Sequence, residues 1–106
     1  MFKRYIKANG KGVNALRCEL YYSLGGFNYF TYKNEARGYY LSVSPVEKSE
    51  HMESYVGFSG VKKCLLEVTR QSKKAEATAE SLVKEHLVNL INHVCANQNV
   101  ELEEAV

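Results

Sequence analysis

The chain contains no aspartate, and this absence removes several classes of active site. It excludes a Ser-His-Asp triad and the aspartate-led loops that bind calcium or magnesium. Gly10-Lys11-Gly12 lacks the spacing of a phosphate-binding P-loop, and no Gly-x-Gly-x-x-Gly motif follows a strand. His86 and His93 share a helix face, but no third ligand stands at a spacing typical of metal sites. We therefore expect a protein that is not an enzyme and that holds no cofactor and no metal.

Long hydrophobic runs are also missing. No segment approaches the ~18–20 apolar residues that a membrane span needs, and the N-terminus lacks the apolar core of a signal peptide. The three cysteines, Cys18, Cys64 and Cys95, are odd in number and far apart, which favours reduced thiols over disulfides. These features predict a cytoplasmic protein without a membrane partner.

Aromatic residues, and the glycines and proline that interrupt helices, are confined to the front of the chain. All twelve aromatic residues, all seven glycines and the only proline lie within residues 1–60. At 106 residues the chain has the length of a single domain, 1–106. We expect a β-sheet half over 1–58, a helical half over 59–97, and an acidic tail over 98–106 that frays.

Charge is divided unevenly along the chain. Residues 1–40 carry seven Lys or Arg and two Glu, a net charge of +5, whereas residues 41–106 carry seven Lys or Arg and ten Glu, a net charge of −3. Such a separation favours oriented binding to a charged partner, and a solvated surface explains it about as well.

The front half has the alternation of an antiparallel meander. Strands are expected near 2–8, 13–24, 38–44 and 52–58, and apolar and polar residues alternate with a period of two over 13–24 and again over 38–44. Gly25-Gly26 fits a two-residue hairpin turn, because glycine adopts positive φ without steric cost. A further strand then follows the turn, with Tyr21 facing Phe30. Pro45 is expected to end the strand that begins near residue 38, since proline cannot donate to the ladder.

The glycine-pair turn also assigns side chains to the two faces of the sheet. It places Leu24, Phe27 and Tyr29 on the inward face, together with Leu20 and Tyr22. The residues that we expect in the core are Leu20, Tyr22, Leu24, Leu41, Val43, Leu65, Val68, Leu87, Leu90 and Ile91.

The back half has the spacing of an amphipathic helix. Apolar residues recur at helical spacing from Val61 to Val94, and Ser59 is a suitable N-cap. A straight helix over 61–97 would be ~55 Å long, which exceeds the ~35 Å diameter of a compact domain of this size. Either the helix breaks near 69–78, or it protrudes and pairs with a second copy. The fold class is α+β: a four- or five-stranded antiparallel meander followed by one long or two shorter C-terminal helices on one face.

One face of the expected sheet combines aromatic rings with arginines. These candidate binding residues are Arg17, Tyr21, Phe30, Tyr32, Arg37 and Tyr40. Aromatic platforms flanked by arginines stack exposed bases and contact phosphates, at ~1–3 kcal/mol per base. The alternative is that another part of the chain or a second copy covers this face, because tyrosine packs well in any sheet.

A second candidate surface is a run of basic residues near the start of the expected helix. It consists of Lys62, Lys63, Arg70, Lys73 and Lys74. On a helix these side chains would lie opposite the apolar stripe, where they could follow a nucleic-acid backbone with salt-dependent affinity. A solvated helix face is the other interpretation of the same pattern.

Three segments resemble small uncharacterised proteins encoded on plasmids, phages and integrative elements of Gram-positive bacteria. They are Leu20-Tyr-Tyr-Ser-Leu-Gly-Gly-Phe-Asn-Tyr-Phe-Thr-Tyr32, Arg37-Gly-Tyr-Tyr-Leu-Ser-Val-Ser-Pro45 and Phe58-Ser-Gly-Val-Lys-Lys-Cys-Leu-Leu-Glu-Val68. The resemblance covers about half of the chain and contains no catalytic motif. Some short proteins of such elements are anti-CRISPR proteins, which bind an RNA-guided nuclease or its guide RNA and block interference. The resemblance thus implies a bacterial host.

We expect a non-catalytic binding protein that acts by occluding a nucleic acid or a nucleoprotein. The most concrete form of this hypothesis is an anti-CRISPR inhibitor of a type II RNA-guided nuclease. One alternative is a direct nucleic-acid-binding accessory protein of a mobile element. Another is a protein-only module that forms a homodimer through its C-terminal helix.

Overall fold

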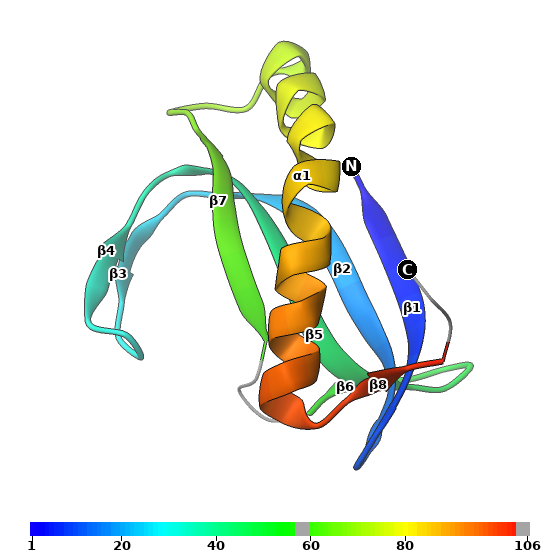
Figure 1. The fold of residues 1–106 in the computed structure, drawn as a ribbon. Helices are drawn as coiled ribbons and strands as arrows, with labels where there is room; N and C mark the ends of the chain where they lie inside the picture. Colours follow the sequence, from blue (N-terminus) through cyan, green and yellow to red (C-terminus); the bar gives the residue numbers. More distant parts are fainter. Residues whose placement is uncertain (57–59, 104–106) are drawn as a thin grey trace.

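The structure is a computed structural model that describes residues 1–56 and 60–103. It confirms the α+β class, with an antiparallel sheet covered on one face by a C-terminal helix (Figure 1). The elements are β1 (Lys3–Gly10), β2 (Val13–Ser23), β3 (Gly26–Asn28), β4 (Lys33–Glu35), β5 (Gly38–Lys48), β6 (Glu53–Tyr55), β7 (Val61–Glu67), α1 (Lys73–Gln98) and β8 (Glu101–Leu102).

Strand β5 is the centre of the main sheet. The strand order is β6-β5-β2-β1-β8, and β7 pairs with β5 as well. Both β6 and β7 lie along the edge of β5 that faces away from β2: β6 pairs with its end at Val46–Lys48 and β7 with its beginning at Gly38–Val43. The two short strands therefore act as one interrupted edge strand.

The expected end of a strand at Pro45 is wrong, because β5 continues through the proline to Lys48. The Pro45 carbonyl accepts a hydrogen bond from the Val56 amide, at 3.2 Å. In an antiparallel strand the N and C=O of one residue point to the same side, so the Pro45 nitrogen, which carries no hydrogen, faces the interruption between β6 and β7. Neither of these two strands pairs with β5 at Pro45, and the proline therefore removes no hydrogen bond from the sheet.

The expected hairpin turn at Gly25-Gly26 is also wrong. Tyr21 pairs with Tyr40 rather than with Phe30. The β3–β4 ladder continues the register of β2 and β5, so the four strands form one long hairpin with a kink at the glycines. Gly25 and Gly26 do adopt positive φ, of 71° and 110°, but they bend the hairpin instead of reversing the chain.

The chain reverses at the tip, between β3 and β4. The Asn28 side-chain oxygen accepts hydrogen bonds from the amides of Phe30 and Thr31, at 2.9 and 3.3 Å. The Tyr32 amide donates to the Asn28 carbonyl at 2.8 Å, and Tyr32 has the left-handed φ of 56°. Asparagine commonly organises turns in this way, because its side chain replaces a backbone partner. We call residues 24–36 the arm.

Helix α1 begins later than expected. Ser72 is its N-cap, and its side chain accepts a hydrogen bond from the Ala75 amide at 3.0 Å. The helix expected over 59–97 is therefore wrong up to residue 72, because Val61–Glu67 pairs with β5 as a strand. The suggested cap Ser59 lies outside the described residues. A helix of 26 residues is about 39 Å long, close to the molecule's longest extent of 38 Å. The helix is thus a single unbroken element, shorter than the ~55 Å expected for 61–97.

The core lies between the sheet and α1. Leu20, Leu41, Val43, Leu87 and Ile91 are buried as expected, and the other expected core residues, with one exception, pack partly buried against them. The exception is Leu24, which is 70% exposed because it lies at the kink. All three cysteines are free, in agreement with the expected reduced thiols.

The acidic tail does not fray immediately after the helix. Asn99 adopts the left-handed conformation that ends α1, and Val100 is buried against the core. Strand β8 then pairs with β1, so the expectation of a frayed tail is wrong for residues 99–102, and residues 104–106 lie outside the described range. Within the described part of the chain, no helix is long and apolar enough to cross a membrane.

Candidate binding surface

The arm concentrates exposed hydrophobic side chains at one end of the molecule. Nine large hydrophobic side chains of the described residues are exposed, and five of them belong to the arm. These five are Leu24, Phe27, Tyr29, Phe30 and Tyr32. A contiguous exposed apolar patch is typical of an interaction site, whereas single exposed apolar residues need no explanation.

The rings at the tip of the arm pack against one another. Phe27 makes edge-to-face contacts with Tyr29 and Tyr32, with centroid distances of 4.9 and 6.4 Å. Because these contacts already restrict the rings, a partner would lose little conformational entropy by ordering them. The tip is therefore a preformed aromatic surface.

The base of the arm is held by three sets of contacts. A Cβ atom at Gly25 would lie 2.6 Å from the Glu35 carbonyl oxygen, so only glycine allows the two sides of the hairpin to approach so closely. The Arg37 guanidinium donates to the carbonyls of Leu24 and Thr69. Lys62 of β7 forms an ion pair of 2.8 Å with Glu35, and this hydrogen bond lowers the pKa of the Glu35 carboxyl.

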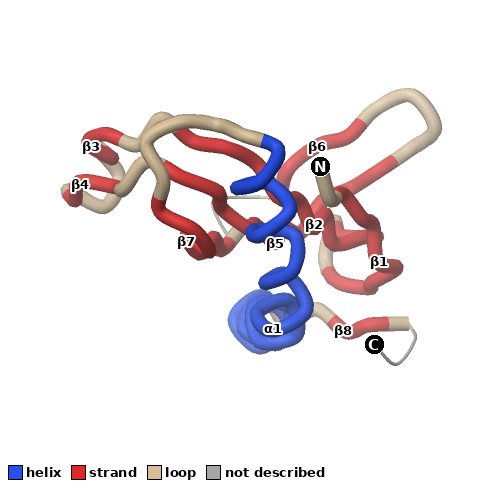
Figure 2. Tube along the Cα trace, turned by 90° about the horizontal axis from the view of Figure 1, so that it is seen from above, coloured by secondary structure: helices blue, strands red, loops and turns tan. Residues whose placement is uncertain are grey.

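The kink turns the arm toward the sheet face opposite α1. Figure 2 shows β3–β4 beyond β7 at one end of the sheet, away from the C-terminal part of α1. A groove of about 600 Å³ lies between the arm and this outer face, and we call it the outer groove. Tyr21, Ser42 and Ser44 line it from the sheet, Phe30 from the arm and Tyr55 from β6.

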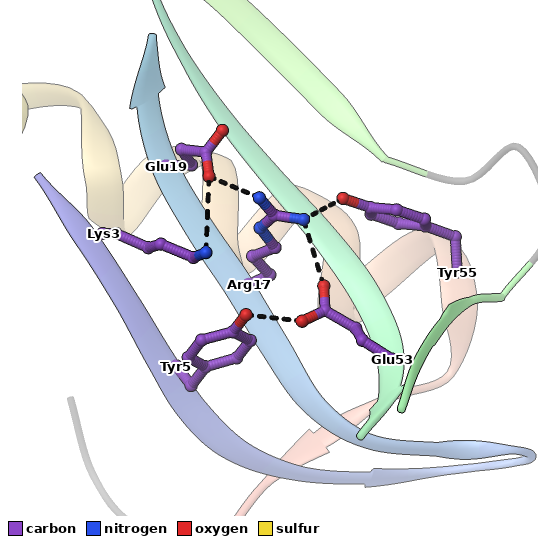
Figure 3. Close-up of polar contacts among 6 residues, drawn as sticks. All are labelled: Lys3, Tyr5, Arg17, Glu19, Glu53 and Tyr55. Carbon is purple, nitrogen blue, oxygen red and sulfur yellow. Dashed lines mark hydrogen bonds and ion pairs between the residues drawn. The ribbon is translucent and has the colours of Figure 1, made fainter. Parts of the chain in front are cut away.

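A polar network covers the outer face next to the groove (Figure 3). Arg17 is its centre and binds Glu19 at 2.5 Å and Glu53 at 3.1 Å. The hydrogen bond to Glu19 raises the pKa of Arg17. Arg17 also donates to the Tyr55 hydroxyl. The guanidinium thus joins β2 to β6, and it is engaged within the protein rather than held ready for a phosphate.

Glu53 receives a second hydrogen bond, from the Tyr5 hydroxyl at 2.5 Å. This bond, followed by the charge of Arg17, lowers the pKa of Glu53, and the same bond raises the pKa of Tyr5. Because Tyr5 belongs to β1, the network connects three strands of the outer face.

The structure divides the predicted aromatic platform into two sets. Tyr21 and Tyr40 stack on the sheet with a centroid distance of 5.9 Å, whereas Phe30 and Tyr32 lie at the tip of the arm. Tyr40 is only 6% exposed, and burial raises the pKa of Tyr40 to about 12, so its ring offers no contact area. Arg37 lies at the kink.

The predicted basic stripe is not formed. Lys62 and Lys63 are adjacent on a strand and so point to opposite faces, with Lys62 beside the outer groove. Arg70 lies in the connection to α1, and only Lys73 and Lys74 are helical. The stripe required a helix over 61–72, which the pairing of β7 with β5 excludes.

The predicted inward position of Leu24, Phe27 and Tyr29 is wrong, because all three are exposed on the arm. The signal that could have revealed them is Asn28, which competes with the glycine pair as a turn former. Among residues 1–56 and 60–103, no three His, Cys, Asp or Glu side chains come together in a way that could hold a metal ion.

No family model matches the chain, and no curated protein or solved structure matches it either.

Proposed function

We propose that this chain is a non-catalytic binding protein of a mobile element, which acts by occlusion and docks its arm on the protein part of a nucleoprotein. The supporting observation is the cluster of exposed aromatic side chains on the arm. Tyrosine and phenylalanine provide large rigid contact areas, and aromatic residues are enriched among those that dominate binding energy.

The charges around the arm favour a protein over a nucleic acid. The outer groove is lined by two carboxylates, Glu19 and Glu35, and by one ammonium group, Lys62. A phosphate in the groove would therefore meet more carboxylate than ammonium groups in the lining, whereas Lys33 and Arg37 lie outside it. The basic residues that could attract a nucleic acid are distributed over several elements instead of forming one surface.

The specific partner that we propose is a type II RNA-guided nuclease, so that the protein would act as an anti-CRISPR inhibitor. Support for this choice comes from the resemblance of residues 20–68 to proteins of Gram-positive mobile elements. An inhibitor that acts by occlusion needs contact area but no catalytic group, and the arm supplies contact area.

The test is target cleavage by a purified, guide-loaded type II nuclease with increasing amounts of the protein. We expect cleavage to stop without degradation of the guide. The double variant Tyr29→Ser/Tyr32→Ser should inhibit at least about 30-fold less, because aromatic hot spots each contribute ~2 kcal/mol or more. The matched control is Met52→Ser, which removes a 71% exposed side chain outside the arm. Full cleavage at saturating wild-type protein would exclude this effector.

Binding to RNA and DNA alone provides the second arm of the test. The proposal expects no binding at low salt. Affinity that falls steeply with salt, and that weakens on Lys→Glu changes at 63 and 74, would instead identify a direct nucleic-acid-binding protein.

A further inference from the structure

The outer groove lies directly beside the arm, so a partner seated on the arm also approaches the groove. We propose that the groove receives the guanidinium group of an arginine on the partner protein. This inference rests on the proposed docking of the arm, and it specifies what the partner must present at the contact.

Glu19 offers an open carboxylate oxygen at the groove. Arg17 and Lys3 both contact Oε2 of Glu19, at 2.5 and 4.0 Å, and no other described residue binds Oε1. Figure 3 shows this second oxygen directed away from both cations. A carboxylate has about four acceptor positions, so Glu19 can accept further hydrogen bonds from a cation without releasing Arg17.

Three hydroxyl groups add acceptors to the groove. Tyr21, Ser42 and Ser44 line it, and their hydroxyls form no hydrogen bond with any other described residue. A guanidinium group carries five N–H donors in one plane and no acceptor. A lining composed mainly of carboxylate and hydroxyl oxygens is complementary to such a group.

Aromatic side chains complete the complementarity. Tyr21, Phe30 and Tyr55 line the groove, and a guanidinium plane stacks on aromatic faces. Arg17 lies near one of these rings as well, with its guanidinium 5.7 Å from the Tyr55 centroid, but it contacts Tyr55 through the hydroxyl and leaves the ring faces to a partner. Lysine would satisfy the charge but neither the planar stacking nor the paired hydrogen bonds.

The open oxygen of Glu19 favours a guanidinium over a phosphate. Lys62 pairs with Glu35. Arg17 binds only Oε2 of Glu19, so Oε1 remains an acceptor that would attract a cation and repel a phosphate. Proteins that bind nucleic acids contact phosphates through arginines. An arginine captured in this groove is therefore withdrawn from its phosphate, which would make occlusion direct.

The experiment is an NMR titration of the ¹⁵N-labelled full chain with N-acetyl-arginine N-methylamide. The matched probe is the citrulline compound, which has nearly the same shape but no charge. We expect the arginine compound to shift the amide signals of Tyr21, Ser42 and Ser44 in a saturable manner. The citrulline compound should bind about tenfold more weakly, because hydrogen bonds to charged groups are roughly twice as strong as neutral ones. Equal affinity of the two probes, or no shift at these amides, would overturn the inference.

Substitutions assign the effect to the groove. Glu19→Gln should weaken arginine binding about tenfold, and Ser42→Ala, which removes one groove hydroxyl, provides a second measurement if the first variant does not fold. Glu80→Gln removes an exposed carboxylate from α1 and should change nothing. If uridine monophosphate shifts the groove amides and arginine does not, the groove binds nucleotides and the inference fails.

The arm variant Tyr29→Ser/Tyr32→Ser separates this inference from the proposed function. It should lose inhibition of the nuclease while keeping the arginine affinity of the wild type, since neither residue lines the groove. Loss of arginine binding in this variant would show that the tip itself binds the probe, against the inference. If the wild-type protein inhibits the nuclease but does not bind the arginine compound, the inference is disproved and the proposed function is not.

Discussion

Tyr39 and Tyr29 belong to the same long hairpin, but one is buried and the other is exposed. Tyr39 lies in the body of the molecule, by which we mean the main sheet and α1, and Tyr29 lies on the arm. Tyr39, on β5, is 1% exposed beneath α1, whereas Tyr29, at the tip of the arm, is 77% exposed. The two ladders share one register, so strand pairing does not cause the difference. The body has a helix and neighbouring strands that cover its aromatic residues, and the arm extends beyond them (Figure 1). Aromatic residues therefore stabilise the body and remain available for a partner on the arm.

The largest expected difference between these regions concerns the removal of a hydrophobic side chain. Leu41→Ala removes a fully buried leucine from β5 and should lower the free energy of unfolding by about 2–5 kcal/mol. Tyr29→Ala on the arm should change it by less than about 0.5 kcal/mol. Urea denaturation of both variants measures the two values. Comparable losses would show that the arm is part of the cooperative core.

The kink between the two regions is the next place to test. Gly25 and Gly12 both have positive φ, of 71° and 73°, but a Cβ at Gly25 would approach backbone atoms of Glu35 and Ala36 within 3 Å, whereas none lies within 4 Å of Gly12. Gly12→Ala should cost about 1–2 kcal/mol from the left-handed backbone alone. Gly25→Ala should cost more, and only this variant should shift the NMR signals of the arm. Equal costs would contradict the close approach at the kink.

Helix α1 distinguishes the body from the arm, and its N-cap provides a smaller effect. Ser72→Ala removes the hydrogen bond to the Ala75 amide and should destabilise the protein by about 1 kcal/mol in thermal or urea unfolding. Thr78→Ala, on the exposed surface of the same helix, is the control, with a change near zero. The signals of the arm should be unchanged in both variants. A shift of the arm in Ser72→Ala would mean that the helix supports it.

The sequence predicted the body better than the arm. The alternation from Leu16 to Leu24 identifies a half-buried strand, because a period of two is distinctive over nine residues. The segment Val61–Glu67 is too short for such a distinction, since its apolar residues fit a strand and a helix alike. Its pairing depends on the free edge of β5, which is distant in sequence, so local spacing could not decide it.

The arm was mispredicted because two turn signals compete within four residues. Gly25-Gly26 favours a tight turn, and Asn28 favours a turn three residues later. A long-range match decides between them: Tyr39 and Leu41 pair with Tyr22 and Leu20 across the sheet only if the glycines form the kink. The exposed positions of Phe30 and Tyr32 agree with a binding role, whereas the outer groove follows from the kink and has no local signature.

The smallest expected effect is the loss of stability at acid pH from two ion pairs. Arg17–Glu53 holds β6, and Lys62–Glu35 holds the base of the arm. The pKa of Glu53 is lowered by Tyr5 and Arg17, and that of Glu35 by Lys62. A carboxylate with a lowered pKa stabilises the folded state above the ordinary value of 4.5, and this contribution is lost as the pH falls through the lowered pKa. Glu53→Gln should therefore cost less than about 1 kcal/mol at neutral pH, because the pair is partly exposed, and the difference from the wild type should vanish in acid. Glu35→Gln should have a smaller effect still on urea unfolding between pH 3 and 7, since it releases the arm and leaves the body intact. A larger pH dependence for Glu35 than for Glu53 would show that the arm, rather than the outer face, carries the acid-sensitive part of the stability.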